Sequence, residues 1–423
     1  MRRVLLLLPT RAYRAADFLE AARELGVEVV VGAEERHALD DVVGSRVIEL
    51  PLHRPDVAAD AIVEFADEVS VDAIVPVDDA GVGAASLAAE RLGLTHSPPA
   101  ATALTRDKAG MRRRLVQAGV PQPDFVVVTY GDDPVAAAAR LGFPVVIKPL
   151  ELSGSQGVIR ADTPAEAAAA AARIQRMLAP STDDEPAPLL IERFVPGVEV
   201  AVEGLLRRGT LHTLAIFDKP DPLDGPYFEE TLYITPSRLP EWRQRVVEDV
   251  TRAAVAGLGL TEAPVHAEVR LDGDAPSVIE VAARSIGGLC ARSLRFGLGV
   301  SLESLILRHA LNLPLRDTTR AHAASGVMML PIPRAGVLVE VRGREAALEV
   351  PGIVGLEITV APGGWVEPLP VGDRYLGFMF ARGETPDAVE SALRRAHAKL
   401  EVEIDPNRAP RRRSGSESSE ADH

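Results

Sequence analysis

Two glutamates that could share a metal ion lie on either side of a predicted turn. Polar and apolar residues alternate along most of residues 264–288, which is typical of two β-strands. The alternation predicts a hairpin that turns near Asp274, with Val278 and Glu280 on one face of the returning strand. Glu268 and Glu280 are equidistant from this turn, so we expect them to be cross-strand neighbours about 5 Å apart.

Two carboxylates at that separation repel each other. The repulsion is relieved by a raised pKa, by a basic partner or by a shared divalent cation. Carboxylate oxygens suit Mg²⁺ or Mn²⁺. A solvated strand face is the alternative, but Arg284 follows Glu280 on the same alternating face, and Gly287-Gly288 then allows close approach of a ligand backbone. These flanking residues favour a metal site.

Lysine is rare in this chain, and one lysine stands beside a loop that could bind phosphate. The lysines are Lys108, Lys148, Lys219 and Lys399, whereas arginine is abundant. Lys148 ends a predicted strand just before residues 150–157, which read LELSGSQG. Glycine and serine can present N–H groups and hydroxyls to phosphate oxygens, and an ordinary hairpin turn is the alternative. We expect Lys148 to contribute charge and little packing.

Three structured parts are predicted to position these residues. Strands alternate with helices over residues 1–97, which predicts a doubly wound parallel sheet. No G-x-G-x-x-G follows its first strand, so a dinucleotide site is not supported. Asp78-Asp79 follow a strand, where either a ligand site or a helix N-cap is expected. Residues 98–320 and 321–405 form the second and third parts, and 406–423 read as a disordered tail.

Composition excludes several function classes. With 47% hydrophobic and 25% charged residues, the chain resembles a soluble globular enzyme, and its net charge of −15 argues against general nucleic-acid binding. Cys290 is the single cysteine, so no internal disulfide or cysteine-built zinc site is expected. No apolar run reaches the roughly 20 residues of a membrane span. The opening apolar run is too short for a signal peptide, so we expect a cytoplasmic protein.

The order of these motifs resembles the ATP-grasp family of carboxylate–amine and carboxylate–thiol ligases. The resemblance runs from about Thr105 to Gly288, and residues 326–403 resemble the C-terminal domain of the L-amino-acid ligase branch. It implies an α/β fold with α+β parts. These are an N-terminal doubly wound parallel-sheet domain, central ATP-grasp domains with a mobile lid at about residues 125–203, and a small C-terminal α+β domain.

The same resemblance assigns roles to individual residues. The implied nucleotide-binding residues are Lys108, Lys148, Ser153, Gly154, Ser155, Gly157, Glu192, Phe194, Val195 and Glu199. Glu192 would accept from the adenine amino group, and Glu199 would hold the ribose hydroxyls. Glu268 and Glu280 match the metal carboxylates. The implied catalytic residues are Arg284, which would steady the acyl phosphate, Glu230, which would meet the substrate amine, and Lys219, which would reach the γ-phosphate.

Two positions depart from the family pattern. Ala282 stands where the family often has an asparagine that binds metal, which puts a third protein ligand in doubt. Tyr233 stands where related dipeptide-forming ligases have a histidine three residues after the glutamate that serves the amino acid. The resemblance therefore supports a role for Glu230 but none for a histidine at position 233.

The activity implied is ATP-dependent joining of a carboxylate to an amine through an acyl phosphate, with ADP and phosphate released. ATP and Mg²⁺ or Mn²⁺ would be required, and at least one substrate would be an amino acid. The expected partners are small molecules, with no nucleic acid and no membrane, and a homodimer is left open. Alternatives are a carboxylase or carbamoyl-phosphate-type enzyme that activates bicarbonate, and a non-catalytic nucleotide-binding module.

Overall fold

The N-terminal part is a doubly wound parallel sheet. The computed structural model describes residues 2–8, 14–35, 47–178, 186–315 and 317–408, so the predicted tail from residue 409 onward lies outside the described residues. The sheet has the order β3-β2-β1-β4 and all its pairs are parallel. Its elements are β1 (Arg3–Leu8), α1 (Ala15–Leu25), β2 (Glu28–Ala33), β3 (Val47–Glu49), α3 (Pro55–Glu68), β4 (Ala73–Pro76) and α4 (Asp79–Arg91).

Alternate residues of β1 face two different cores, which is why helices cover both faces of this sheet. Leu6 and Leu8 pack with Phe18 of α1, whereas Leu5 and Leu7 pack with residues of α3 and α4. The continuous apolar run of β1 is typical of a parallel strand buried on both sides. The strand order reverses direction between β1 and β4, so the carboxyl ends of these two strands border the crevice where such sheets bind ligands.

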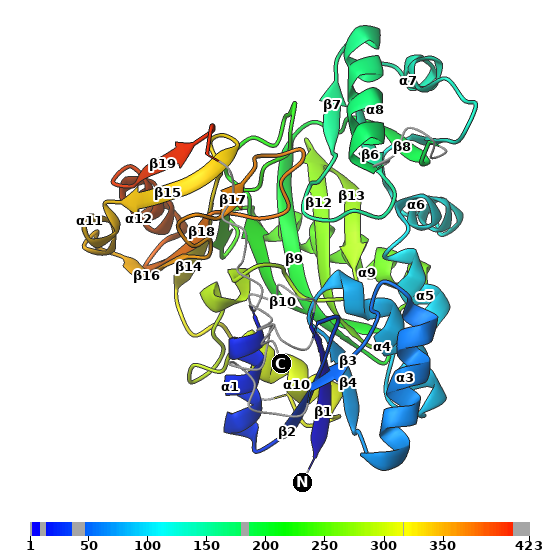
Figure 1. Cartoon of the computed structure of the whole chain (residues 1–423), viewed down its shortest axis with the longest axis vertical. Coiled ribbons are helices and arrows are strands. Elements are labelled where there is room, and N and C mark those ends of the chain that lie inside the picture. Colours follow the sequence, from blue (N-terminus) through cyan, green and yellow to red (C-terminus); the bar gives the residue numbers. More distant parts are fainter. Residues whose placement is uncertain (1, 9–13, 36–46, 179–185, 316, 409–423) are drawn as a thin grey trace, which may run out of the picture.

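A small antiparallel sheet with its own core forms the predicted lid, at the top of Figure 1. Its strands have the order β5-β8-β6-β7, and two helices pack on it. The elements are β5 (Phe125–Val128), α7 (Pro134–Leu141), β6 (Val145–Pro149), β7 (Ile159–Ala161), α8 (Pro164–Leu178) and β8 (Leu189–Arg193). The helices α5 (Pro99–Leu104) and α6 (Lys108–Gln117) precede the lid in sequence. The strand after β8 joins a different sheet, so the lid sheet spans residues 125–193.

A single eight-stranded antiparallel sheet connects the middle of the chain to its C-terminal part. Its order is β13-β12-β9-β10-β11-β14-β18-β16. The strands are β9 (Val198–Arg207), β10 (Thr210–Asp218), β11 (Leu232–Thr235), β12 (Ala263–Asp272), β13 (Ala275–Ala282), β14 (Ala324–Leu330), β16 (Ile353–Ile358) and β18 (Gly377–Gly383). Helix α9 (Glu241–Leu258) packs against β13 and its neighbours, and α10 (Leu302–Ala310) packs against α1 and β4. A short 3-10 helix, η2 (Cys290–Ser293), precedes α10.

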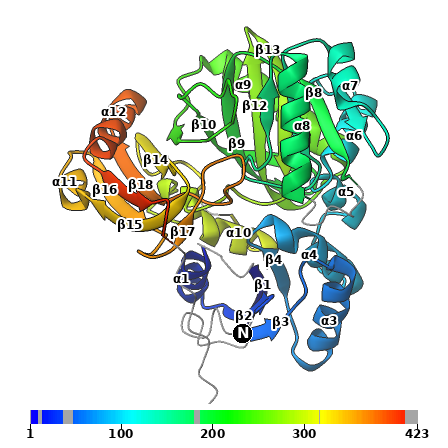
Figure 2. The ribbon, with the colours of Figure 1, turned by 45° about the horizontal axis from the view of Figure 1, so that its top comes forward.

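The C-terminal part adds a second, three-stranded sheet of order β17-β15-β19. Its elements are β15 (Gly336–Arg342), α11 (Arg344–Leu348), β17 (Trp365–Val366), α12 (Pro386–His397) and β19 (Glu401–Asp405). Figure 2 shows these elements to one side of the central sheet, with the N-terminal sheet below. Because β14, β16 and β18 extend the large sheet, the C-terminal part shares a core with it, and the domain boundaries given above stay predictions. Among the described residues, no helix has the length and apolar character that crossing a membrane requires.

The predicted hairpin is present as β12 and β13, and Glu268 lies directly opposite Glu280. The prediction that Val278 shares a face with Glu280 was wrong. A bulge shifts the register so that Val269 pairs with Val278, and Ile279 is the extra residue. Val278 therefore enters the hydrophobic core, while Glu280 remains on the opposite face with Glu268.

Candidate active site

A cavity of about 320 Å³ lies where the lid, the large sheet and the N-terminal sheet meet. All predicted site residues line it except Lys219 and Gly157. Gly157 donates its N–H to the Pro370 carbonyl at 2.9 Å, and Gln156 donates to the Val371 carbonyl at 3.2 Å. The predicted phosphate loop thus contacts a segment of the C-terminal part that sequence reasoning did not connect with it.

The end of the cavity beside β6 and β8 holds a buried carboxylate between two cations. Glu192 Oε1 accepts from Arg112 Nε at 2.5 Å, and Glu192 Oε2 lies 2.5 Å from Lys148 Nζ. Burial acts to raise the pKa of Glu192, but Arg112 and Lys148 outweigh it and lower the pKa to about 2. Lys148 is only 6% exposed. The expectation that it contributes little packing was wrong, because its ammonium balances a carboxylate inside the protein.

The predicted phosphate loop, residues 150–157, contains three residues in the left-handed backbone conformation. Gly154, Ser155 and Gly157 all have positive φ, at 62°, 59° and 67°. Serine rarely adopts this left-handed conformation, so the loop holds Ser155 in an uncommon backbone state. Lys108, at the start of α6, donates to the Leu152 carbonyl at 2.5 Å and lies 3.8 Å from Glu280. One lysine therefore contacts both the loop and a predicted metal carboxylate.

Lys219 joins three acidic residues of the cavity. Its ammonium lies 2.7 Å from Glu199 and 3.1 Å from Glu268, and it also donates to Glu230. The three carboxylates offer oxygens within 4.8 Å of one another, a spacing that suits a cation. Burial acts to lower the pKa of Lys219, but these carboxylates raise it well above its ordinary value. The predicted role of Lys219 at the γ-phosphate stays a prediction.

Two of the carboxylates around Lys219, the predicted substrate residue Glu230 and the predicted metal ligand Glu268, differ in their protonation. Burial, together with the charge of Glu268, raises the pKa of Glu230 to about 7, although Lys219 opposes the shift. Burial also acts to raise the pKa of Glu268, but Lys219 and His266 outweigh it and hold the pKa well below its ordinary value. Glu230 can thus exchange a proton near neutral pH while Glu268 stays ionised.

Arg284 is held by an aspartate of the N-terminal sheet. Its Nη2 donates to Asp79 Oδ2 at 2.9 Å, and Arg106 lies 3.4 Å from the other Asp79 oxygen. Burial acts to raise the pKa of Asp79, but Arg284 and Arg106 outweigh it and lower the pKa. Asp78 is the N-cap of α4 and accepts from the Ala80 N–H. The pair therefore combines a helix cap with a side chain that orients a cavity arginine.

Three family models match successive parts of the chain. An ATP-grasp N-terminal domain matches residues 19–96, an ATP-grasp domain matches residues 141–293, and an L-amino acid ligase C-terminal domain matches residues 328–405. Their order is the order in which the parts of the fold occur. The chain belongs to the ATP-grasp superfamily.

Individual relatives agree with this placement. Alanine–anticapsin ligase of Bacillus subtilis is 30% identical over 263 residues, covering 58% of this chain and 55% of that protein, so the match spans about half of the curated relative. The L-amino acid ligase of Bacillus licheniformis superposes with a TM-score of 0.79 at 24% identity, covering 96% of this chain and 99% of that one. The biotin carboxylase domain of Hydrogenobacter thermophilus 2-oxoglutarate carboxylase, in complex with MgADP and bicarbonate, superposes with a TM-score of 0.68 at 18% identity, covering 95% and 91%. At these identities the two structures show the shared fold alone.

The predicted metal carboxylates of this ATP-grasp chain are chemically suited to a magnesium ion. Glu268 and Glu280 face each other across β12 and β13, and both line the cavity. Carboxylate oxygens are the ligands that Mg²⁺ prefers. Ala282, two residues further along β13, also lines the cavity but offers no side-chain ligand. Glu268 and Glu280 therefore stay the predicted metal ligands, and Glu268 also belongs to the carboxylate group around Lys219.

Tyr233 takes up the position that departs from the dipeptide-ligase pattern, and it is nearly fully buried in this ATP-grasp fold. Its ring stacks on Phe217 with centroids 5.5 Å apart, and the Lys219 ammonium lies 5.2 Å from its centroid. Burial raises the pKa of Tyr233 well above its ordinary value, so the hydroxyl stays protonated. Tyr233 can therefore shape the cavity and shield Lys219, but it does not carry the charge of a histidine.

Sequence reasoning missed several residues that support the site. Arg112 follows Lys108 by one helical turn on α6, and this spacing could have indicated that both face the lid. His266 lies two residues before Glu268 on the same strand face, with Nδ1 3.2 Å from Glu203. Hydrogen bonds to Glu203 and Glu268 raise its pKa to about 9 against the effect of burial. No pattern in the sequence pointed to Glu203, because a single glutamate within an apolar strand does not indicate which residue it will bind.

Proposed function

We propose that this protein joins a carboxylate to an amine at the expense of ATP, releasing ADP and phosphate, and that at least one substrate is an amino acid. The observation that carries the proposal is one cavity that contains both halves of such chemistry. Lys108, Lys148 and a loop with left-handed residues lie at the nucleotide end. Glu230 and Arg284 lie in the same cavity. The match to the L-amino acid ligase C-terminal domain supports an amino-acid substrate.

The first step places negative charges close together, so the protein must neutralise them. The substrate carboxylate attacks the γ-phosphorus of ATP, the bond to the bridging oxygen breaks, and ADP leaves with the electron pair. Lys108 and Lys148 supply positive charge beside the phosphate loop, with Glu192 and Arg112 fixing the Lys148 ammonium. Magnesium held by Glu268 and Glu280 would add charge neutralisation between the phosphates and the carboxylates.

The second step consumes the acyl phosphate. The amine attacks the acyl carbon, the carbon–oxygen bond to phosphate breaks, and the nitrogen loses a proton. Glu230 suits this proton, because a base works best when its pKa is near the working pH and that of Glu230 is raised to about 7. Arg284, fixed by Asp79, stabilises the negative charge that develops on the acyl group and the departing phosphate.

The proposal is tested by phosphate release from ATP and Mg²⁺ across pairs of amino acids, with the amide product identified by mass spectrometry. We expect phosphate release that depends on both substrates, and a loss of several orders of magnitude in Glu280→Gln. Glu345→Gln on α11 changes an exposed glutamate far from the cavity and serves as the matched control.

A bicarbonate arm separates the alternative functions. Phosphate release that requires bicarbonate, with no amide formed from any amino-acid pair, would contradict the ligase proposal. It would identify a carboxylase or carbamoyl-phosphate-type enzyme that activates bicarbonate. MgATP binding without turnover under every condition would identify a nucleotide-binding module instead.

A further inference from the structure

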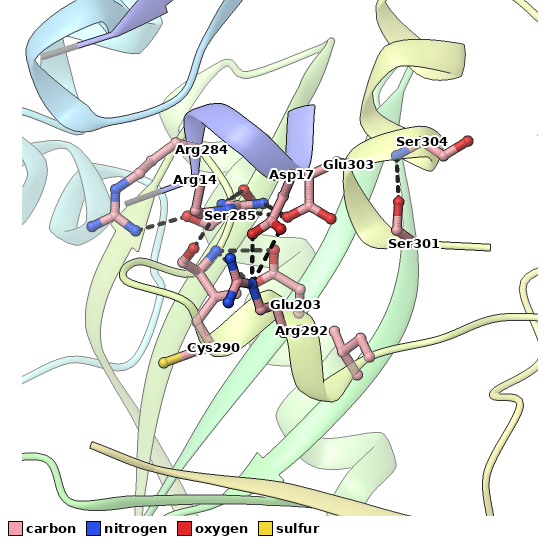
Figure 3. Close-up of polar contacts among 12 residues, drawn as sticks. Arg14, Asp17, Glu203, Arg284, Ser285, Cys290, Arg292, Ser301, Glu303 and Ser304 are labelled. Atoms are coloured by element: carbon pink, nitrogen blue, oxygen red, sulfur yellow. Dashed lines mark hydrogen bonds and ion pairs between the residues drawn. The ribbon is translucent and has the colours of Figure 1, made fainter. Parts of the chain in front are cut away.

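The segment that carries Arg284 is held from two sides by residues that follow strands of the N-terminal sheet. Asp79 begins α4, directly after β4, and binds the Arg284 guanidinium at 2.9 Å. Arg14 precedes α1, the helix that follows β1, and donates from Nη1 to Ser285 Oγ at 2.7 Å and to the Ile286 carbonyl at 2.9 Å. Figure 3 shows Arg14 and Arg284 on either side of Ser285.

These two contacts come from adjacent strands at the point where the sheet order reverses. β1 and β4 are neighbours, and their carboxyl ends border the crevice that usually receives a ligand in an open α/β sheet. In this protein Arg14 and Asp79, which follow these two strands, contact residues 284–286 and also line the cavity. The crevice therefore borders the proposed active site, and residues 284–286 lie between the two.

The polar groups of this segment are almost completely engaged by buried partners. The Ile286 N–H donates to both oxygens of Glu203, at 3.0 and 3.1 Å, and Arg284 Nη1 donates to the Ser285 carbonyl. Glu203 has no exposed surface. With the Ile286 carbonyl held by Arg14, the backbone on both sides of Ile286 is fixed before any substrate arrives.

The cation that holds the segment has a carboxylate of its own. Arg14 Nη2 lies 2.6 Å from Glu303 Oε1, and the side chains are 3% and 1% exposed. A buried ion pair adds little net stability, because desolvation offsets most of the attraction, whereas an apolar pair of similar size would pack as well. The Arg14–Glu303 pair is therefore better explained by the directed hydrogen bonds that Arg14 makes to Ser285 and Ile286.

We propose that Arg14 and Asp79 are positioning residues, through which the N-terminal sheet fixes the Arg284–Ile286 segment in the geometry that the reaction needs. This inference rests on the proposed ligase function. Amide formation then depends on these contacts to residues 284–286, even though Arg14 and Asp79 do not react with the substrate.

Two variants and one matched control test the inference. Asp79→Asn keeps the shape of the side chain but removes its charge. The double variant Arg14→Met/Glu303→Leu removes both members of the ion pair, so that no unpaired charge stays buried. Asp17→Asn is the control, because Asp17 lies in the first turn of α1, close to Arg14 in sequence, and binds Arg292 at 2.9 Å without contact to the segment (Figure 3).

The measurements are amide exchange at Ile286–Gly288 in the ligand-free protein, and the kcat and KM of amide formation. We expect about tenfold faster exchange in the double variant, and a kcat about 10- to 100-fold lower in Asp79→Asn with the KM for ATP within about threefold of wild type. Asp17→Asn should change neither quantity.

Three results would overturn the inference or the function beneath it. Unchanged amide exchange and kcat in Asp79→Asn and in the double variant would overturn the proposed positioning role of Arg14 and Asp79. A kcat that falls together with melting temperature in all three variants would show an interface that only stabilises the fold. Wild-type protein that forms no amide would overturn the proposed function, and the exchange data would still decide whether Arg14 holds the segment.

Discussion

Replacing Glu192 with glutamine should destabilise the protein by an amount that depends on pH. The pKa of Glu192 is lowered from its ordinary value of 4.5 to about 2 by Arg112 and Lys148, against the effect of burial. This lowering of the pKa corresponds to about 3 kcal/mol of stability at pH 7. The shift is downward, so this stability is fully present above pH 4.5 and is lost as pH falls toward 2. At pH 3 about 1 kcal/mol should remain.

The assay is the free energy of unfolding in urea at a series of pH values for wild type and Glu192→Gln. We expect the difference between the two proteins to be largest at pH 7 and to shrink as the solution is acidified. Glu151→Gln changes an exposed glutamate in the same lid and should show no such trend. A difference that is independent of pH, or a Glu192→Gln protein as stable as wild type at pH 7, would refute the electrostatic reasoning.

The other predictions concern the metal carboxylates, the base and the lid. Glu280→Gln should keep its melting temperature within a few degrees while phosphate release falls by orders of magnitude. Glu268→Gln should lose phosphate release and also stability, because it leaves Lys219 with one carboxylate partner fewer. Equal stability losses in the two variants would contradict this difference. The kcat of amide formation should rise through about pH 7 as Glu230 ionises, and Glu230→Gln should lack this rise; the same pH profile in both proteins would exclude Glu230 as the base. Amide exchange in residues 152–158 should slow when MgADP is added, and unchanged exchange would argue against lid closure.

The spacing of the hairpin predicted that Glu268 lies opposite Glu280, but it did not supply the whole reason. Asp272 pairs with Ala275, so a regular hairpin with this turn would place Ile279 opposite Glu268, and the bulge is what brings Glu280 there. The bulge at Ile279 could not be predicted, because isoleucine is as favourable in a regular strand as in a bulge. Its consequence reaches the site, since it places Val278 in the core and brings Glu280 opposite Glu268.

The partners of buried charges were the part that sequence could not supply. Lys148 was recognised as a phosphate-binding candidate, but its ion pair with Glu192 joins residues on two strands of the lid that are 44 positions apart. The contacts of Arg14 with Ser285 and Glu303 cross more than 270 positions. The first pairing depends on which strands become neighbours in the lid sheet, and the second depends on how the N-terminal part meets the large sheet. The local periodicity that reveals strands and helices carries no information about either.

The central claim is that a substrate carboxylate is activated by direct transfer of the γ-phosphoryl group. The most direct test follows oxygen from an amino acid labelled with ¹⁸O in its carboxylate, in a reaction with ATP, Mg²⁺ and a second amino acid. Attack of the carboxylate on the γ-phosphorus followed by attack of the amine predicts one ¹⁸O atom in the released phosphate for each amide formed. Unlabelled phosphate, or release of AMP and pyrophosphate in place of ADP and phosphate, would contradict the account.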